Sequence, residues 1–70
     1  MEKYKEMVQK FMEAMNEAEK IAEQFSREYW NDEEIEETEG LAIVAEEIEN
    51  MLVCHFGACK RILERGLEKM

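Results

Sequence analysis

The spacing of the apolar residues constrains the fold of this chain more than any other feature. In the first half of the sequence an apolar residue recurs every three or four positions, and the series consists of Tyr4, Met7, Val8, Phe11, Ala14, Met15, Ala18, Ile21, Ala22, Phe25 and Tyr29. This spacing gathers apolar side chains on one face of an α-helix, which has ~3.6 residues per turn. The sequence therefore predicts one amphipathic helix over about residues 2–30.

A second periodic series occupies the C-terminal half and consists of Leu41, Val44, Ala45, Ile48, Met51, Leu52, His55, Ala58, Cys59 and Ile62. The chain has no proline, and its three glycines weaken a helix locally without ending it. We predict a second helix over about residues 39–69, after an acidic connection over about residues 31–38. Asn31, Asp32 and Thr38 are all suitable helix caps, so the connection forms either the first turns of the second helix or a short separate helix.

Two long helices with one short connection form an antiparallel hairpin. A chain of 70 residues buries only about 60% of the surface of its unfolded state, so its core is thin and a second domain does not fit. The prediction is an all-α fold in which residues 1–70 form a single helical domain.

A second apolar line runs along the predicted second helix, and it consists of Val53, Phe56, Leu63, Leu67 and Met70. Each helix of a hairpin has only one neighbour, so we expect this line on the outer face. Leaving a large apolar side chain exposed there costs about 1.5–3 kcal/mol relative to burial. We favour self-association into a homodimeric four-helix bundle, through Val53, Phe56, Leu63 and Leu67. A foreign partner and an uncovered monomer surface are the alternatives.

The net charge of −9 comes from 18 acidic and nine basic residues. A chain this acidic lacks the clustered lysines and arginines that bind phosphate backbones, which argues against direct binding of nucleic acid. The charge is unevenly spread, because residues 31–50 hold nine acids and no base, while the rest of the chain is neutral overall. In a hairpin this acidic segment lies at the end closed by the connection.

Three interpretations of the acidic segment are open. It is a solvated face that complements a helix dipole, a surface that docks on a basic partner, or a metal site in which glutamates four apart share an ion. Our functional prediction rests on the second interpretation. The candidate partner-binding residues are Trp30, Glu36, Glu37, Glu39, Glu46, Glu47 and Glu49.

His55 and Cys59 lie four residues apart on the main apolar series, a spacing that suits two zinc ligands on one helix. They are weak candidates, because the other two ligands would have to come from a second protomer. The simpler interpretation is a core histidine beside two buried cysteines. On a helix Cys54 and Cys59 point about 140° apart, which excludes a disulfide between them and indicates a reducing compartment.

The sequence carries no apolar leader and no membrane-spanning stretch, so we expect a cytoplasmic protein. Cys54 and His55 are adjacent in the sequence, but on a helix they project about 100° apart and cannot form a nucleophile-base pair. No cofactor motif is present. We therefore predict a small non-enzymatic protein that docks on the nucleic-acid-binding or effector-binding surface of a larger protein, as a phage-type or regulatory inhibitor that mimics nucleic acid would. The alternatives are a metal-dependent helical enzyme or metal-binding bundle, and a purely structural oligomerisation module.

Overall fold

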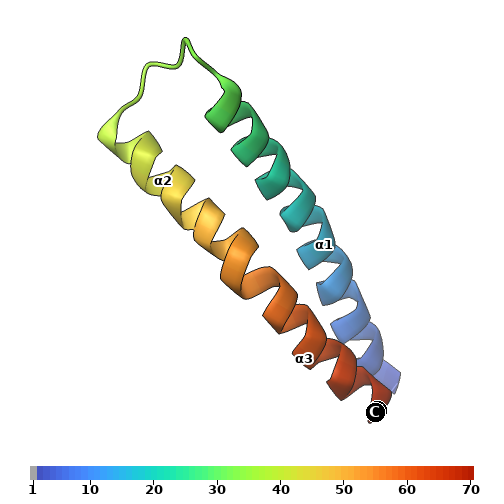
Figure 1. Cartoon of the computed structure of the whole chain (residues 1–70). Coiled ribbons are helices and arrows are strands. Elements are labelled where there is room, and N and C mark those ends of the chain that lie inside the picture. Colours follow the sequence, from blue (N-terminus) through green and yellow to red (C-terminus); the bar gives the residue numbers. More distant parts are fainter. Residues whose placement is uncertain (1) are drawn as a thin grey trace.

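Two long helical rods lie side by side and run in opposite directions in the computed structural model, which describes residues 2–70 (Figure 1). The first rod is α1 (Glu2–Asn31). The second rod is continuous and consists of α2 (Glu39–Asn50), the π-helix η1 (Met51–His55) and α3 (Phe56–Glu68). The predicted all-α fold class is confirmed, and the molecule is elongated, measuring 50 × 18 × 17 Å.

The connection between the rods is organised by short-range hydrogen bonds. Asn31 closes α1 by donating from its side chain to the carbonyl oxygen of Arg27 at 2.7 Å. The carboxylate of Asp32 accepts from the backbone N–H of Glu34 at 3.0 Å, which turns the chain without starting a helix. Thr38 has extended backbone angles, and its hydroxyl accepts from the N–H of Leu41 at 3.1 Å. Thr38 is therefore the cap that begins the second rod, and residues 32–38 contain no helix.

The interhelical seam of α1 follows a strict alternation of three and four residues. Its members are all buried or half-buried, and they are Lys5, Val8, Met12, Met15, Glu19, Ala22, Ser26 and Tyr29. The seam is narrower than the apolar series of α1, because one neighbouring rod covers only one stripe of a helix. Seven of the eleven apolar residues in that series therefore remain outside the seam.

The π-helix η1 changes the face that the second rod presents to α1. In α2 and the first turn of η1 the residues that face α1 are Leu41, Ala45, Ile48 and Leu52. In α3 they are Phe56, Lys60, Leu63 and Leu67. The N–H of Phe56 bonds to the carbonyl oxygen of Met51, five residues back, so the turn holds one extra residue. One extra residue rotates all that follows by about 100° relative to an unbroken α-helix.

This rotation corrects the faces that we assigned to the C-terminal half from the sequence. His55 and Cys59, expected in the core, are exposed, as is Cys54. Phe56, expected on the outer face, is buried at 8% exposure. Leu63 and Leu67 are half-buried on the seam side, whereas Val53 is 73% exposed. A role for these residues in self-association stays a prediction. Phe56, Leu63 and Leu67 face α1 within the hairpin.

Two polar contacts cross the seam and fix how the rods are aligned. The hydroxyl of Ser26 donates to the carboxylate of Glu49 at 3.2 Å near the closed end. The ammonium of Lys60 forms an ion pair with Glu19 farther along, where both side chains are only about a fifth exposed at 22% and 23%. Because each group needs one particular partner, a slipped alignment would leave a half-buried charge unpaired.

Deleting Cys54 should be tolerated, because it removes the extra residue of η1 and turns the second rod into an unbroken α-helix with the same seam residues. We expect an unchanged or higher Tm by circular dichroism. Deleting Glu23, an exposed residue of α1 with no π-turn nearby, should rotate half of the seam away from its partner. This control should lower Tm by more than about 10 °C. Equal damage from both deletions would contradict the role of η1.

Exchanging the charges of Glu19 and Lys60 tests the ion pair. Glu19→Lys or Lys60→Glu alone places two like charges in the seam, and each should destabilise the fold by about 1–3 kcal/mol. The double variant restores opposite charges and should recover most of that loss, measured by urea denaturation at one fixed chain concentration. Additive losses in the double variant would show that the pair contributes nothing.

Candidate functional site

The acidic segment, residues 31–50, lies at the end of the hairpin that the connection closes (Figure 1). We call this the closed end. The opposite end, the open end, holds residues 2–10 and 51–70, which together carry seven bases and four acids. The molecule is therefore strongly polarised along its long axis, with a net charge of −9 in the acidic segment and +3 at the open end.

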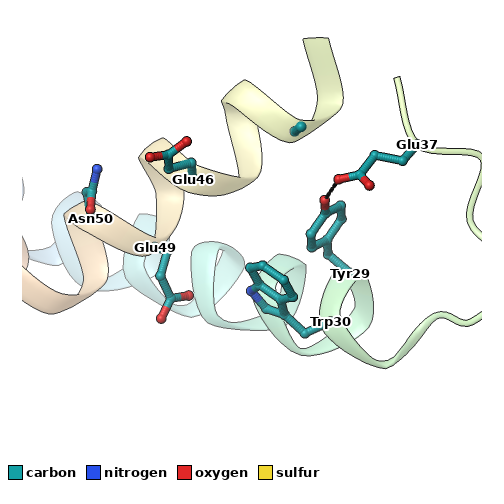
Figure 2. Close-up of a pocket in the computed structure, with 7 residues that line it drawn as sticks. Tyr29, Trp30, Glu37, Glu46, Glu49 and Asn50 are labelled. Carbon is teal, nitrogen blue, oxygen red and sulfur yellow. Dashed lines mark hydrogen bonds between the residues drawn. The ribbon is translucent and has the colours of Figure 1, made fainter. Parts of the chain in front are cut away.

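A pocket of ≈ 320 Å³ opens at the closed end between the last turn of α1, the connection and α2. Its lining is aromatic on one side and carboxylate-rich on the other, and it consists of Tyr29, Trp30, Glu37, Ala42, Glu46, Glu49 and Asn50. Figure 2 shows the two aromatic rings standing on the α1 side, with Glu46, Glu49 and Asn50 along α2.

The aromatic side of the pocket is held by ring contacts. Tyr29 and Trp30 meet edge to face, with ring centroids 4.9 Å apart and planes at 83°. Phe25, one turn earlier, stacks parallel to Tyr29 with centroids 6.0 Å apart. Both arrangements suit the quadrupoles of the rings. Tyr29 is thereby fixed from two sides, and the indole of Trp30 is left 64% exposed at the pocket edge.

The carboxylates of the pocket have different partners. Tyr29 donates a hydrogen bond to Glu37, which ties the connection to α1 (Figure 2). That hydrogen bond is the main cause of a raised pKa for Tyr29, and burial and the negative charge of Glu37 add to it. Glu49 accepts from Ser26 through one oxygen, while Glu46 lies exposed on α2.

The structure brings together four of the seven residues that the sequence nominated for partner binding, namely Trp30, Glu37, Glu46 and Glu49. Glu36, Glu39 and Glu47 are exposed and lie outside the pocket lining. Sequence reasoning missed Tyr29, because it was counted as an ordinary member of the apolar series. It also missed Asn50, which follows Glu46 by four residues and so lies on the same face of α2.

Chemically, this pocket suits an organic cation. A lysine or arginine side chain is attracted to the face of an aromatic ring, and its N–H groups form short, charge-assisted hydrogen bonds with carboxylates. A metal centre has less support, since no group of three metal-ligating side chains converges anywhere in residues 2–70. The exposed His55 and Cys59 belong to no such group in that part of the chain.

The chain matches no known family model, and no curated protein or solved structure is significantly similar to it. Within residues 2–70, every helix is too short or too polar to cross a lipid bilayer.

Titration of Tyr29 tests the contact between α1 and the connection. In a Tyr4→Phe background, Tyr29 is the sole tyrosine, and its ionisation is followed by tyrosinate absorbance. Glu37→Gln should lower the pKa of Tyr29 toward the value of a free tyrosine, about 10, because the anionic acceptor is lost. Glu36→Gln is the matched control and should leave the titration unchanged.

The hydrogen bond between Tyr29 and Glu37 also determines how the stability of the fold changes with pH. A raised pKa means that the fold favours neutral Tyr29, so this stabilisation is complete below pH ~10 and disappears as the pH rises through the folded-state value. In Tyr29→Phe the free energy of unfolding should therefore fall less steeply with pH in that alkaline range. An alkaline titration that is identical in both backgrounds would contradict the hydrogen bond.

Proposed function

We propose that this chain is a non-enzymatic binding protein whose closed end docks on the basic surface of a larger protein. The observation that carries the proposal is the pocket of two aromatic rings and three carboxylates within a base-free segment of net charge −9. A basic surface that normally binds nucleic acid or an anionic effector is the kind of partner that this charge complements. Occupying such a surface would make the protein an inhibitor.

The pocket supplies the specific part of this interaction. A lysine or arginine of the partner would enter between the rings and Glu46, with its cation against a ring face and its N–H groups on carboxylate oxygens. Trp30 is the only tryptophan of the chain, and tryptophan is enriched among the residues that dominate binding energy. Its exposed indole is therefore the anchor that we assign to the interface.

The remaining acidic residues supply the non-specific part. Glu36, Glu39 and Glu47 lie outside the pocket, but they add to the same negative field. A field of this kind accelerates association with a basic partner, and salt screens it over about 10 Å at 0.1 M ionic strength. Binding should thus weaken as salt is added, through a slower association rate.

The proposal includes a homodimeric four-helix bundle as the framework that carries two closed ends. Its support is the thin core of the hairpin, because only Ser26, Ala45 and Phe56 are buried within residues 2–70. Small helical proteins with so little buried surface gain stability by oligomerisation.

The fluorescence of Trp30 offers a direct test with a defined probe. An arginine- and lysine-rich peptide should change the emission of Trp30 on binding, while a peptide of equal length with glutamine at every basic position should not. Glu46→Gln should weaken binding about tenfold, which corresponds to the loss of about 1.4 kcal/mol. Trp30→Phe, followed by calorimetry, should weaken it as well.

Glu47→Gln is the matched control, because it removes the same charge from the adjacent position outside the pocket. It should weaken binding by much less than Glu46→Gln at physiological salt. Equal effects would mean that the peptide responds only to the overall field and would remove the pocket from the proposal. No binding of the basic peptide even at low salt would overturn the proposed function.

A further inference from the structure

One flank of the hairpin is apolar along its whole length. On α1 it follows the positions adjacent to the seam, and its members are Tyr4, Met7, Phe11, Ala14, Ala18, Ile21 and Phe25. Four of these large side chains are more than half exposed, at 58% for Tyr4, 56% for Met7, 57% for Phe11 and 63% for Ile21. We call this surface the apolar flank.

The second rod contributes to the same flank. A groove of ≈ 460 Å³ lies between the two rods, and its walls are almost entirely apolar. It is lined by Phe11 and Met15 of the first rod and by Met51, Phe56, Cys59, Ile62 and Leu63 of the second. Val44 lies seven residues before Met51, and hence on the same face of the rod. The flank is thus a continuous surface across both rods, and it is hollowed between them.

The total exposed surface is large for a chain of this size. The chain exposes 5828 Å², whereas a compact monomer of 8.4 kDa exposes about 4,600 Å². The excess, about 1,200 Å², exceeds the 800 Å² or so that each partner buries in a stable complex of standard size. The chain thus exposes more surface than a compact monomer, by an amount comparable to what one partner of a stable complex buries.

We propose that the apolar flank binds the same flank of a second copy, in antiparallel orientation, so that two hairpins form a four-helix bundle. This inference rests on the dimer named in the proposed function and assigns its interface and orientation. The interface differs from the line of Val53, Phe56, Leu63 and Leu67 that we predicted from the sequence. Phe56 and Leu63 line the groove, but Phe56 is mostly buried within the hairpin, and Val53 lies outside the groove.

The charge distribution along the hairpin favours a second copy as the binding partner, and it favours the antiparallel orientation. In an antiparallel pair, the closed end of one hairpin, with its segment of net charge −9, lies beside the open end of the other, with net charge +3. A parallel pair would place two such acidic segments side by side. A second copy thus carries the charge distribution that complements this flank from end to end, and only when it is reversed.

The residue sizes along α1 fit the same two-fold axis. If the axis passes midway between Ala14 and Ala18, each alanine faces the partner's copy of the other, and Phe11 faces the partner's Ile21. Met7 then faces the partner's Phe25. Small residues at the centre let the helices approach closely, and large ones on both sides fill the space. The centre also falls at the middle of α1, as a symmetric antiparallel pair requires.

The proposed interface leaves the Trp30 pocket accessible. Trp30 and Ile21 are nine residues apart on α1, and so point in opposite directions around the helix, about 180° apart. Glu46 and Val44 are likewise far apart around α2. Self-association and partner binding therefore use different flanks, and each can be removed without the other.

Sedimentation equilibrium of the full chain measures the predicted mass of twice 8.4 kDa. Phe11→Glu and Ile21→Glu should give monomers. Ile43→Glu and Val53→Glu are matched controls, because these side chains are equally exposed, at 62% and 73%, but lie outside the groove, and they should remain dimeric. The Tm of the unsubstituted chain should rise with chain concentration, which keeps the test valid if the monomeric variants unfold.

Orientation is measured with one spin label per chain in the connection, at Glu33→Cys in a Cys54→Ser, Cys59→Ser background. An antiparallel pair places the two labels at opposite ends of a molecule 50 Å long, whereas a parallel pair places them close together. A short label distance overturns the proposed orientation. A dimer that persists in Phe11→Glu and Ile21→Glu overturns the interface.

A folded monomer with a concentration-independent Tm overturns self-association, whether the flank stays bare or binds a foreign apolar molecule such as a detergent. This outcome is separable from failure of the proposed function. Glu46→Gln should bind the basic peptide about tenfold more weakly and remain a dimer. A dimer that never binds the basic peptide would contradict the proposed function and leave the proposed interface intact.

Discussion

The extra residue in the π-helix η1 decides which side chains of the second rod contact α1, and much of the structure depends on it. Without that turn, His55, Cys59 and Ile62 would follow Leu52 into the seam. With it, Phe56 fills the centre of the hairpin, and Lys60 reaches Glu19. One half-buried ion pair and one buried aromatic ring therefore depend on a single unusual turn in an otherwise regular helix.

The same rotation explains why the two flanks of the hairpin differ. It moves Cys59 and Ile62 out of the seam and onto the side of Phe11, where they complete an apolar surface across both rods. The opposite side carries Trp30 together with Glu46 and Glu49 of α2. The two rods of a hairpin pack only against each other, so both flanks remain free to bind other molecules. In the proposed arrangement the apolar flank binds a second copy, and the acidic flank binds a basic partner.

Charge acts at two levels in this molecule. Locally, Glu37 and Glu49 are hydrogen-bonded to Tyr29 and Ser26, so these carboxylates help to close the hairpin as well as to line the pocket. Over the whole length, the contrast between the closed and open ends gives the molecule a direction. In the proposed antiparallel pair this contrast is used inside the dimer, and the pockets at the two far ends stay free to bind basic partners.

The sequence by itself determined the all-α class, the extent of α1 and the position of the acidic segment, because helical periodicity and charge are local properties of the chain. It also identified Trp30 and the pocket glutamates, but not Tyr29, whose hydrogen bond to Glu37 spans the connection. Only the tertiary structure decided the faces of the C-terminal half. Two apolar stripes overlap there, and either could have packed against α1. The π-helix η1 turns Phe56, Leu63 and Leu67 toward α1, and no local feature of the sequence predicts this π-helix.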